Sequence, residues 1–506
     1  MSTSDICIII SIVVYLCMTL YIGYRYSKSN NNSEDFYLGG RKMGPLVTAM
    51  SAEASDMSSW LLMGLPGVAY LSGICDAGWT AIGLGIGTWL NWFFVSKRLR
   101  VYSGNLGAIT VPDFFSKRFH DKKNILTAIA ALIIVVFFIP YTASGFAACG
   151  KLFNTLFGVD YTVAMLVAAA IIVCYTIMGG FSAVCTTDLI QSIVMSIALV
   201  VIIGFGVVTA GGIGSVIDNA KELPGYLSMV ATHNAKTGKA SPYGFISIIS
   251  TLAWGLGYFG MPHILVRFMS IEDKEKLKLS RRVATVWAFI AMTVAIFIGV
   301  VGLAMSNNGS IEALEDSERI IMTISSLISS HGIFAALVAG VILAGILAAT
   351  MSTADSQMLA AASGVTENIL KDFFGFKMDN KKSVLLARIT IIVIAVIGVF
   401  IALDPNSSVF EIVSFAWAGF GGAFGAVMLL ALFWKRTTLA GALSGMLCGG
   451  ASVFVWKFVI RPLGGIFDIY ELLPAFLISL AVAVVVSLCT KAPSADIIEE
   501  FEKAKN

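Results

Sequence analysis

Charged residues are scarce in this sequence of 506 residues: Asp, Glu, Lys and Arg make up 13% of it, against about 25% in soluble domains. The net charge is only +3 and the basic residues form no patch, which argues against nucleic-acid binding. The eight cysteines include no C-x-x-C pair, so we expect small buried residues instead of metal ligands or disulfides. No set of acid, base and nucleophile appears, so no catalytic residue is assigned and an enzyme is not expected.

Apolar residues dominate instead, at 57% of the chain, with a mean hydropathy of +0.86. About thirteen apolar stretches approach the length that crosses a bilayer, which predicts one all-α polytopic membrane domain over residues 1–506. The expected spans are 6–24, 46–70, 77–95, 124–150, 160–179, 189–212, 243–265, 283–305, 333–361, 385–403, 409–433, 437–459 and 472–490.

The loops predict the orientation. If the amino terminus lies outside, most of the 34 Lys and Arg residues fall in cytoplasmic segments, as the positive-inside rule requires. An odd number of spans then puts the carboxyl terminus in the cytoplasm. The first span has no preceding basic residue and no cleavage site, so we expect a retained helix. The expected location is the plasma membrane, which in a bacterium is the inner membrane.

One expected span, Met50–Gly67 (MSAEASDMSSWLLMGLPG), holds two carboxylates and four serines. A charge at the centre of a bilayer costs about 2.5–3.5 kcal/mol even on lenient scales, so such a segment usually binds or moves something. Gly64, Pro66 and Gly67 are expected to interrupt its helix and free backbone carbonyls. The segment therefore indicates an ion or solute site.

A second span, Thr251–Pro262 (TLAWGLGYFGMP), is also expected to break, since three glycines and a proline lie within it. Two broken helices five spans apart are typical of an inverted repeat that binds substrate and ions at the breaks. We expect the repeats to cover residues 46–212 and 243–433, a 5+5 arrangement.

A third polar segment is Leu347–Gln357 (LAATMSTADSQ), where Ser352 and Thr353 place adjacent hydroxyls near Ala349. Hydroxyls and freed carbonyls are ligands that suit a hard monovalent cation. The alternative is that these hydroxyls bond back to the carbonyls one turn earlier. Taken with the break at Ala54–Met57, a cation site is the better interpretation.

Several long motifs resemble the sodium:solute symporter family, and within it the branch of sodium/proline symporters. They are SAEASDMSSWLLMGLPG, GGFSAVCTTDLIQ, WGLGYFGMPHILVRFM, ILAATMSTADSQ and FAWAGFGGAFG, in family order. The resemblance implies a leucine-transporter-like fold of thirteen helices. It also implies secondary active symport, in which inward sodium flow drives uptake of a small amino acid, with L-proline as the expected substrate and sodium as the coupling ion.

The resemblance also implies the site residues. Sodium would be held by backbone carbonyls and two hydroxyls, with supporting roles for two aspartates. The carbonyls are those of Ala54, Met57 and Ala349, the hydroxyls those of Ser352 and Thr353, and the aspartates are Asp56 and Asp188. For both aspartates the alternative role is a helix cap or a pair with a loop cation, and capping applies above all to Asp188, near the start of a span.

The amino acid would contact residues on three spans, namely Ser58, Tyr141, Trp254, Tyr258, Met261 and Pro262. Trp254 and Tyr258 are four residues apart and would share a face of an α-helix, with packing as their alternative role. The chain departs from the family twice. Met261 replaces a common Gln, which bears on the substrate, and Glu53 replaces a small residue and would add charge near the outer vestibule.

Two alternatives stay open at this point. One is a sodium symporter for another small amino acid or a carboxylate, and the other is a membrane receptor that senses a solute. Arg41 in GGRKMGP is expected to set the topology or to close an inner gate.

Overall fold

The computed structural model describes residues 2–28, 32–404 and 408–505. Within these residues nine helices are long and apolar enough to cross a membrane, and a bent pair, Phe245–Phe259 with Pro262–Ser270, is a tenth candidate. The predicted spans 46–70 and 77–95 consist of shorter helices joined end to end. The all-helical polytopic class is confirmed, and the predicted count of thirteen spans is approximate.

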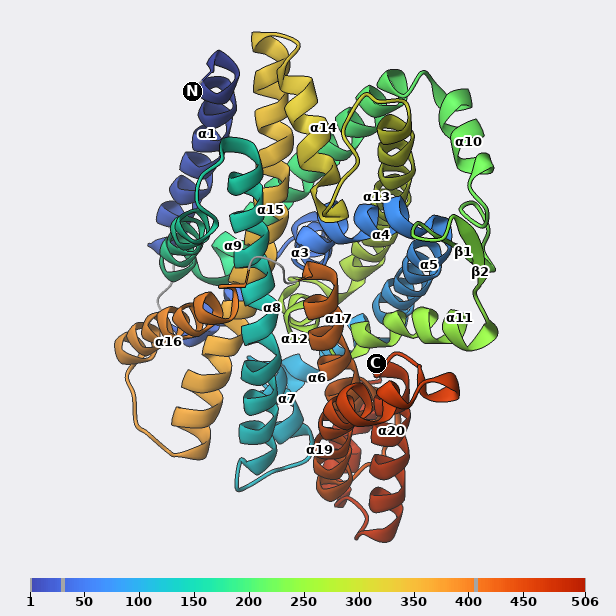
Figure 1. The fold of residues 1–506 in the computed structure, drawn as a ribbon. Coiled ribbons are helices and arrows are strands. Elements are labelled where there is room, and N and C mark those ends of the chain that lie inside the picture. The colour runs from blue at the N-terminus through green and yellow to red at the C-terminus, as the bar shows by residue number, and fades with distance from the viewer. Residues whose placement is uncertain (1, 29–31, 405–407, 506) are drawn as a thin grey trace.

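The structure contains long bundle helices, short helices at both ends of the bundle and one β-hairpin (Figure 1). The helices are α1 (Thr3–Ser27), α2 (Ser33–Leu38), α3 (Pro45–Asp56), α4 (Leu65–Ser72), α5 (Ile74–Leu90), α6 (Ser96–Asn105), α7 (Val111–Arg118), α8 (Ile125–Phe157), α9 (Tyr161–Thr209), α10 (Ile213–Glu222), α11 (Phe245–Leu252), α12 (Pro262–Ser270), α13 (Leu277–Asn307), α14 (Ile320–Ser329), α15 (Ile333–Ser363), α16 (Asn380–Ile401), α17 (Val409–Phe420), α18 (Ala426–Phe433), α19 (Leu439–Val455), α20 (Leu472–Cys489) and α21 (Ala495–Lys503). Strands β1 (Ala231–Asn234) and β2 (Lys239–Pro242) pair antiparallel.

Short 3₁₀ or π segments extend or join these helices. They are η1 (Gly39–Arg41), η2 (Trp60–Gly64), η3 (Asn91–Val95), η4 (Ala253–Phe259), η5 (Lys274–Lys276), η6 (Ser317–Arg319), η7 (Gly364–Phe373), η8 (Gly421–Gly425), η9 (Trp456–Ile460), η10 (Arg461–Leu463) and η11 (Gly465–Phe467).

The first broken helix is confirmed, and its break lies at the predicted Ala54–Met57 and not at Gly64–Gly67. Helix α3 ends at Asp56, and Met57 has a non-helical ψ of 62°. The π-helical turn η2 then leads into α4 through Gly64, whose backbone is helical. Pro66 follows η2 without a break, since Leu65 is helical and its N–H donates to the Trp60 carbonyl five residues earlier, the π-type spacing that accommodates an irregular residue within a helix. The prediction that the Gly-Pro-Gly residues break the helix is therefore wrong.

The second broken helix lies where the sequence predicts it. Helix α11 tightens into the 3₁₀ segment η4, which ends before Met261, and α12 resumes at Pro262 with a bend of 44°. Glycines allow η4 to contact α5 backbone to backbone, since a Cβ on Gly255 would lie 2.2 Å from the carbonyl oxygen of Gly83. The glycines thus serve the close approach of these helices as well as the break.

Helix α9 combines two predicted spans, 160–179 and 189–212, in one helical run. Its backbone is non-helical at Gly180, with φ 61° and ψ −168°, a conformation that glycine adopts without a Cβ clash. The chain therefore turns between the two spans without an intervening loop.

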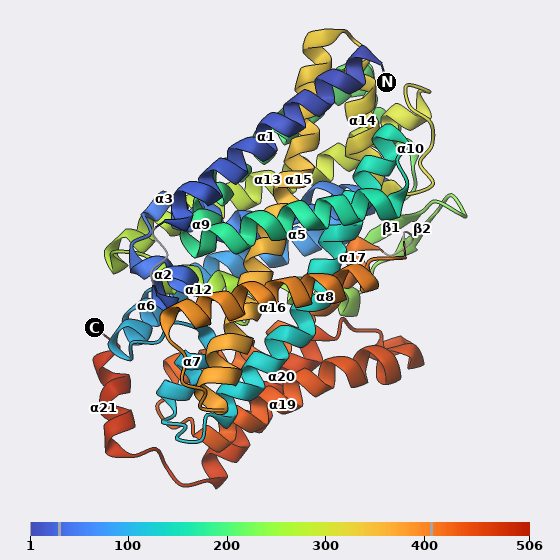
Figure 2. The same cartoon turned by 90° about the vertical axis from the view of Figure 1, so that its left-hand side faces the viewer.

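The two broken helices lie at the centre of the bundle. Helix α3 contacts α9, α12, α13 and α15, and α15 also packs against α1 and α8. In Figure 2 the long helices run side by side, and the two termini lie at opposite ends of them. The central position brings both breaks to the polar segment of α15.

The cysteines differ in part from the prediction. All eight are free, as expected, but Cys17, Cys174, Cys448 and Cys489 are exposed. These four lie on helices of the bundle surface, where an apolar side chain can face lipid. Small size and apolar character, not burial inside the protein, explain their positions.

Candidate functional site

The backbone and hydroxyl groups predicted to hold sodium meet where α3 ends against α15. The Ser352 hydroxyl donates to the carbonyl oxygen of Ala54 at 2.7 Å and lies 3.1 Å from that of Ala349. The Thr353 hydroxyl lies 3.2 Å from the same Ala349 carbonyl. Met57 directly follows the end of α3, and the last carbonyls of a helix lack intrahelical partners. The structure therefore brings together oxygens of the type that a monovalent cation requires.

Asp56, beside this cluster, is buried and tied to the second broken helix. Its carboxylate accepts a hydrogen bond from the Tyr258 hydroxyl. The Tyr258 carbonyl in turn accepts from the side-chain amide of Asn91 at 3.0 Å. One tyrosine thus links the break in α3 to the 3₁₀ segment η4, the two places where substrate and ion binding are expected.

Ser58 and Tyr141 lie next to this link. The Ser58 hydroxyl accepts from the backbone N–H of Trp60 at 3.1 Å. The buried Tyr141 hydroxyl faces Ser58 and Asp56 but makes no hydrogen bond of normal geometry with a described residue. An unsatisfied hydroxyl inside a protein is costly, so Tyr141 is well suited to bond a ligand.

Trp254 and Tyr258 do not present one common face; their rings lie on either arm of a contact with Trp417, at 6.5 Å and 5.1 Å between ring centroids. Its ring stacks on Tyr470 at 5.2 Å and lies 5.4 Å from the ring of Phe410 and 5.9 Å from that of Trp60. The prediction of a shared face assumed an α-helix, whereas η4 is a 3₁₀ helix, in which residues four apart point in different directions. Trp254 therefore belongs to an aromatic cluster with Trp60, Phe410 and Tyr470.

Met261 and Pro262 form the break itself. Met261 is fully buried, and its carbonyl accepts the backbone N–H groups of Ile264 and Leu265 at 3.2 Å and 3.0 Å. Pro262 is the first residue of α12. The main-chain geometry at Met261 thus starts α12.

Asp188 lies apart from the Tyr258–Asp56 link, in a buried network around Arg267. The Arg267 Nη2 group donates to the Asp188 carboxylate at 2.9 Å and to the Ser356 hydroxyl at 2.6 Å, and Nε donates to Ser51 at 2.6 Å. Ser356 also donates to the carbonyl of Ser352 at 2.8 Å. The network therefore begins one helical turn from the sodium-type oxygens. Asp188 makes an ion pair and is not a helix cap.

Removing Arg267 should destabilise the protein strongly, because both charges of this pair are almost fully buried. We expect Arg267→Gln to cost about 3–5 kcal/mol of unfolding free energy and the double variant Arg267→Gln/Asp188→Asn to regain much of it. Thermal unfolding of the purified protein measures both. Lys276→Gln, which breaks a surface pair with Glu272, is the control and should change the midpoint little. Equal losses in the single and double variants would show that the pair does not act as a unit.

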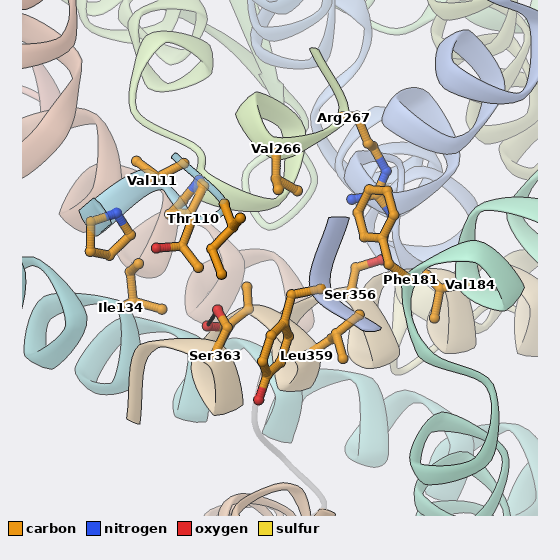
Figure 3. Close-up of a pocket in the computed structure, with 15 residues that line it drawn as sticks. Thr110, Val111, Ile134, Phe181, Val184, Val266, Arg267, Ser356, Leu359 and Ser363 are labelled. Carbon is orange, nitrogen blue, oxygen red and sulfur yellow. Dashed lines mark hydrogen bonds between the residues drawn. The ribbon is translucent and has the colours of Figure 1, made fainter. Parts of the chain in front are cut away.

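The cavities on the two sides of the site are unequal. A cavity of about 850 Å³ lies between α4, α8, α17 and the segment before α14, and Phe410 forms part of its wall. On the other side Pro262, Arg267 and Ser356 line a cavity of only about 30 Å³ (Figure 3), room for about two or three water molecules. The site is therefore open on one side and closed on the other.

Arg41 holds the closed side together. Its guanidinium donates to the carbonyl of Met269 at 2.9 Å, that of Ser103 at 3.2 Å and that of Ala108 at 2.5 Å. These three carbonyls belong to α12, α6 and the segment after α6. The arginine thus joins the carboxyl end of α12 to α6 and to the segment after it. That segment leads into Ile109 and Thr110, which line the 30 Å³ cavity.

Glu53 does not line the large cavity. The residue is buried, and its carboxylate accepts from Trp92 at 3.2 Å and Thr88 at 3.4 Å. The residues that line the large cavity do not include it. The prediction that Glu53 adds charge to a vestibule is wrong, because α3 turns this face toward α5.

Sequence reasoning missed two elements of the site. Arg267 stands inside a quoted motif, and a lone arginine in the apolar run of a broken helix requires a buried partner, so a signal was present. Phe410, whose ring lies against that of Trp254, stands near the start of an apolar span. No polar residue or periodic pattern in the sequence marks it as part of a site.

Comparisons with known proteins agree with this arrangement. The model of the sodium:solute symporter family matches residues 36–449. A sodium/proline symporter of Staphylococcus aureus is 41% identical over 504 residues, covering 98% of this chain and 95% of the relative. The sodium/proline symporter of strain NCTC 8325 / PS 47 is 42% identical over 505 residues, with the same coverage.

Two solved structures show the fold. A sodium-coupled sialic acid symporter in a substrate-bound outward-open state matches with a TM-score of 0.79 and 18% identity, covering 96% of this chain and 99% of that one. Mhp1, a nucleobase-cation-symport-1 family transporter in a closed conformation, matches with a TM-score of 0.57 and 15% identity, covering 94% and 99%. Both have the leucine-transporter fold, which confirms the predicted fold class.

Proposed function

Since the chain belongs to the sodium:solute symporter family, we propose that it imports L-proline together with sodium across the plasma membrane. The observation that carries the proposal is the meeting of the Ala54 and Ala349 carbonyls with the Ser352 and Thr353 hydroxyls at the end of α3. The relatives at 41–42% identity, named sodium/proline symporters, support proline as the substrate.

Sodium would replace the hydrogen bonds that these groups make to each other. The ligands would be the carbonyls of Ala54, Met57 and Ala349 and the hydroxyls of Ser352 and Thr353. Because Ser352 bonds to Ala54 on α3, a cation there would hold α3 against α15. The ion would in this way fix the break beside which the substrate binds.

Proline would bind on the other side of the break. The free Tyr141 hydroxyl and Ser58 would meet its polar groups, and Tyr258 and the aromatic cluster of Trp254 would cover the pyrrolidine ring. Tyr258 reaches both sites, since its hydroxyl bonds Asp56 one residue before Met57. Binding of proline and of sodium would thereby favour the same position of α3.

Release would follow the narrow side. The large cavity would face outward with the amino terminus, and the two repeats, residues 46–212 and 243–433, would rock to widen the 30 Å³ cavity beside Arg267. The Arg41 contacts would have to break in that step. The termini lie at opposite ends of the long helices in Figure 2, as an odd number of spans requires, and the basic residues of the loops support an outside amino terminus.

One sodium ion is enough to drive the import. A potential of 100 mV, inside negative, contributes about 2.3 kcal/mol per charge, and a tenfold sodium gradient adds about 1.4 kcal/mol. One-to-one coupling could thus sustain about a 500-fold proline gradient at about 1.4 kcal/mol per decade.

Uptake of labelled proline by proteoliposomes tests the proposal. We expect accumulation with an inward sodium gradient and none when choline replaces sodium. Unlabelled competitors decide between proline, other small amino acids and carboxylates. Sodium-dependent uptake of another solute without competition by proline would reject the substrate and keep the coupling ion.

Met261 is the place to test substrate choice. Replacing this buried thioether by the family's common amide, in Met261→Gln, adds a donor and an acceptor beside the break. We expect proline transport to persist. The ratio of inhibition constants between polar and apolar proline analogues should change by about tenfold or less. Competition curves measure the order, and identical curves for both proteins would remove Met261 from the pocket.

A further inference from the structure

The carboxyl-terminal helix α21 folds back onto the body of the protein, and Figure 2 shows it beside α6. Its Phe501 side chain is only 2% exposed, and Ala504 is buried as well. Glu499 and Lys503, on the opposite face of the helix, are exposed and pair with each other. The ring of Phe501 is therefore the group by which α21 is held, and we call it the anchor.

The anchor lies between two arginines of the first repeat. Its centre is 4.6 Å from Cζ of Arg98 on α6 and 5.1 Å from Cζ of Arg118 on α7. Arg118 is fully buried, and neither of its Nη groups has a hydrogen-bond partner among the described residues. A guanidinium is attracted to an aromatic face, most strongly where water is excluded. The two arginines therefore depend on the rings around them, the anchor included.

The same two arginines reach the second repeat. Arg118 Nε donates to the carbonyl of Ala431 at 2.9 Å, and Cζ of Arg98 lies 5.2 Å from the centre of the Phe433 ring. Ala431 and Phe433 both belong to α18. The anchor thus occupies the place where α6 and α7 of the first repeat meet α18 of the second.

The segment that α21 holds is also the one that Arg41 holds. Arg41 donates to the carbonyls of Ser103 and Ala108, and Ser103 is adjacent to Tyr102, whose ring contacts the anchor. The chain then continues to Thr110, which lines the 30 Å³ cavity. A movement that widens this cavity has to move the segment between α6 and α7. Both Arg41 and α21 oppose that movement.

The anchor carries most of the docking of α21. Outside it, the described residues of α21 make one ion pair with the body of the protein, in which Glu500 Oε2 lies 2.8 Å from His120 Nε2. Both side chains of this pair are more than a third exposed, and an exposed ion pair contributes little. Removing the ring should therefore release the helix.

We propose that α21 is a latch that keeps the narrow side of the transporter closed, by fastening α6 and α7 to α18 through Phe501. This inference rests on the proposed rocking of the two repeats, which shifts α6 and α7 against α18. The ring has to leave the arginines before the repeats rock. Release of α21 therefore favours the state that is open to the cytoplasm.

Modification of a cysteine in the 30 Å³ cavity tests the proposal. Ala360→Cys places a thiol on the wall of this cavity, in a full chain whose four exposed cysteines are replaced by alanine, in inside-out vesicles without sodium. The same chain without Ala360→Cys gives the background. We expect Phe501→Ala to raise the rate of reaction with a membrane-impermeant maleimide about fivefold or more, the size expected for loss of two ring–guanidinium contacts. No described residue of α21 lines the cavity, so departure of the helix does not by itself uncover the thiol.

Two further variants separate the latch from general effects. Ala504→Trp forces a large side chain into the buried position beside the anchor and should raise the rate as Phe501→Ala does. Glu499→Gln removes an exposed acid from the far face of α21 and should leave the rate within about twofold. Unchanged or slower modification in both Phe501→Ala and Ala504→Trp would overturn the latch. The measurement needs no proline, so a failure of proline uptake would reject the proposed function and leave this result to stand on its own.

Discussion

Ser352→Ala should raise the sodium concentration for half-maximal proline uptake about tenfold or more, the effect of losing roughly 1.4 kcal/mol of ion binding. The hydroxyl joins the carbonyl of Ala54 on α3 to that of Ala349 on α15, so its loss removes an oxygen and the contact between the helices. Thr353→Ala should have a smaller effect, since Thr353 bonds only within α15. Uptake at graded sodium concentrations, corrected for the protein in the membrane, measures both.

Ser363→Ala provides the matched control for these variants. Ser363 lies on the same helix, and its hydroxyl donates to Ala360 one turn earlier, the local bond that would explain Ser352 without a cation. Sodium dependence should be normal in Ser363→Ala. The same normal dependence in Ser352→Ala would mean that its hydroxyl only satisfies a helix carbonyl.

Asp56→Asn should reduce proline uptake more than tenfold, because the amide cannot replace a charged acceptor for the Tyr258 hydroxyl beside the break in α3. Asp56→Glu should retain more uptake, since a carboxylate still reaches the tyrosine. Tyr258→Phe, which removes only the hydroxyl, should resemble Asp56→Asn if the link between the two broken helices is what matters.

Initial rates of proline uptake at saturating sodium compare these three variants with the wild type. Thr232→Ala, on the distant β-hairpin, controls for expression and reconstitution. Full activity of Asp56→Asn would show that neither the charge nor the link is required.

The fold was predictable because lipid imposes strong rules on sequence. Every span needs a long apolar run. A broken helix in the membrane requires glycine, proline or polar residues within that run, and these can be recognised in the sequence. The prediction placed the break of α11–α12 correctly at Pro262. It also placed a break correctly at Ala54–Met57, but wrongly expected another at Gly64–Gly67, because a proline that a π-helical turn accommodates and a proline that breaks a helix look alike in sequence.

The site was predictable in its residue types and less so in its geometry. The polar segments Met50–Gly67 and Leu347–Gln357 identified Asp56, Ser352 and Thr353. The structure brings the end of α3 against the middle of α15, where these residues lie. The side chains of Trp254 and Tyr258 point in different directions because their segment is a 3₁₀ helix. The backbone of this segment packs closely against Gly83 and Gly87 of α5. Arg267 and Asp188 lie far apart in the chain, and their contact depends on tertiary packing. A local sequence pattern does not predict such a pair.

The central claim is that proline and sodium cross together, and the most direct measurement is sodium flux driven by proline. Proteoliposomes would hold equal sodium on both sides, with the membrane potential clamped at zero and labelled sodium as the tracer. A sudden inward proline gradient should then drive net sodium uptake, with Ser352→Ala showing much less at the same sodium concentration. Sodium flux that ignores the proline gradient would contradict the account.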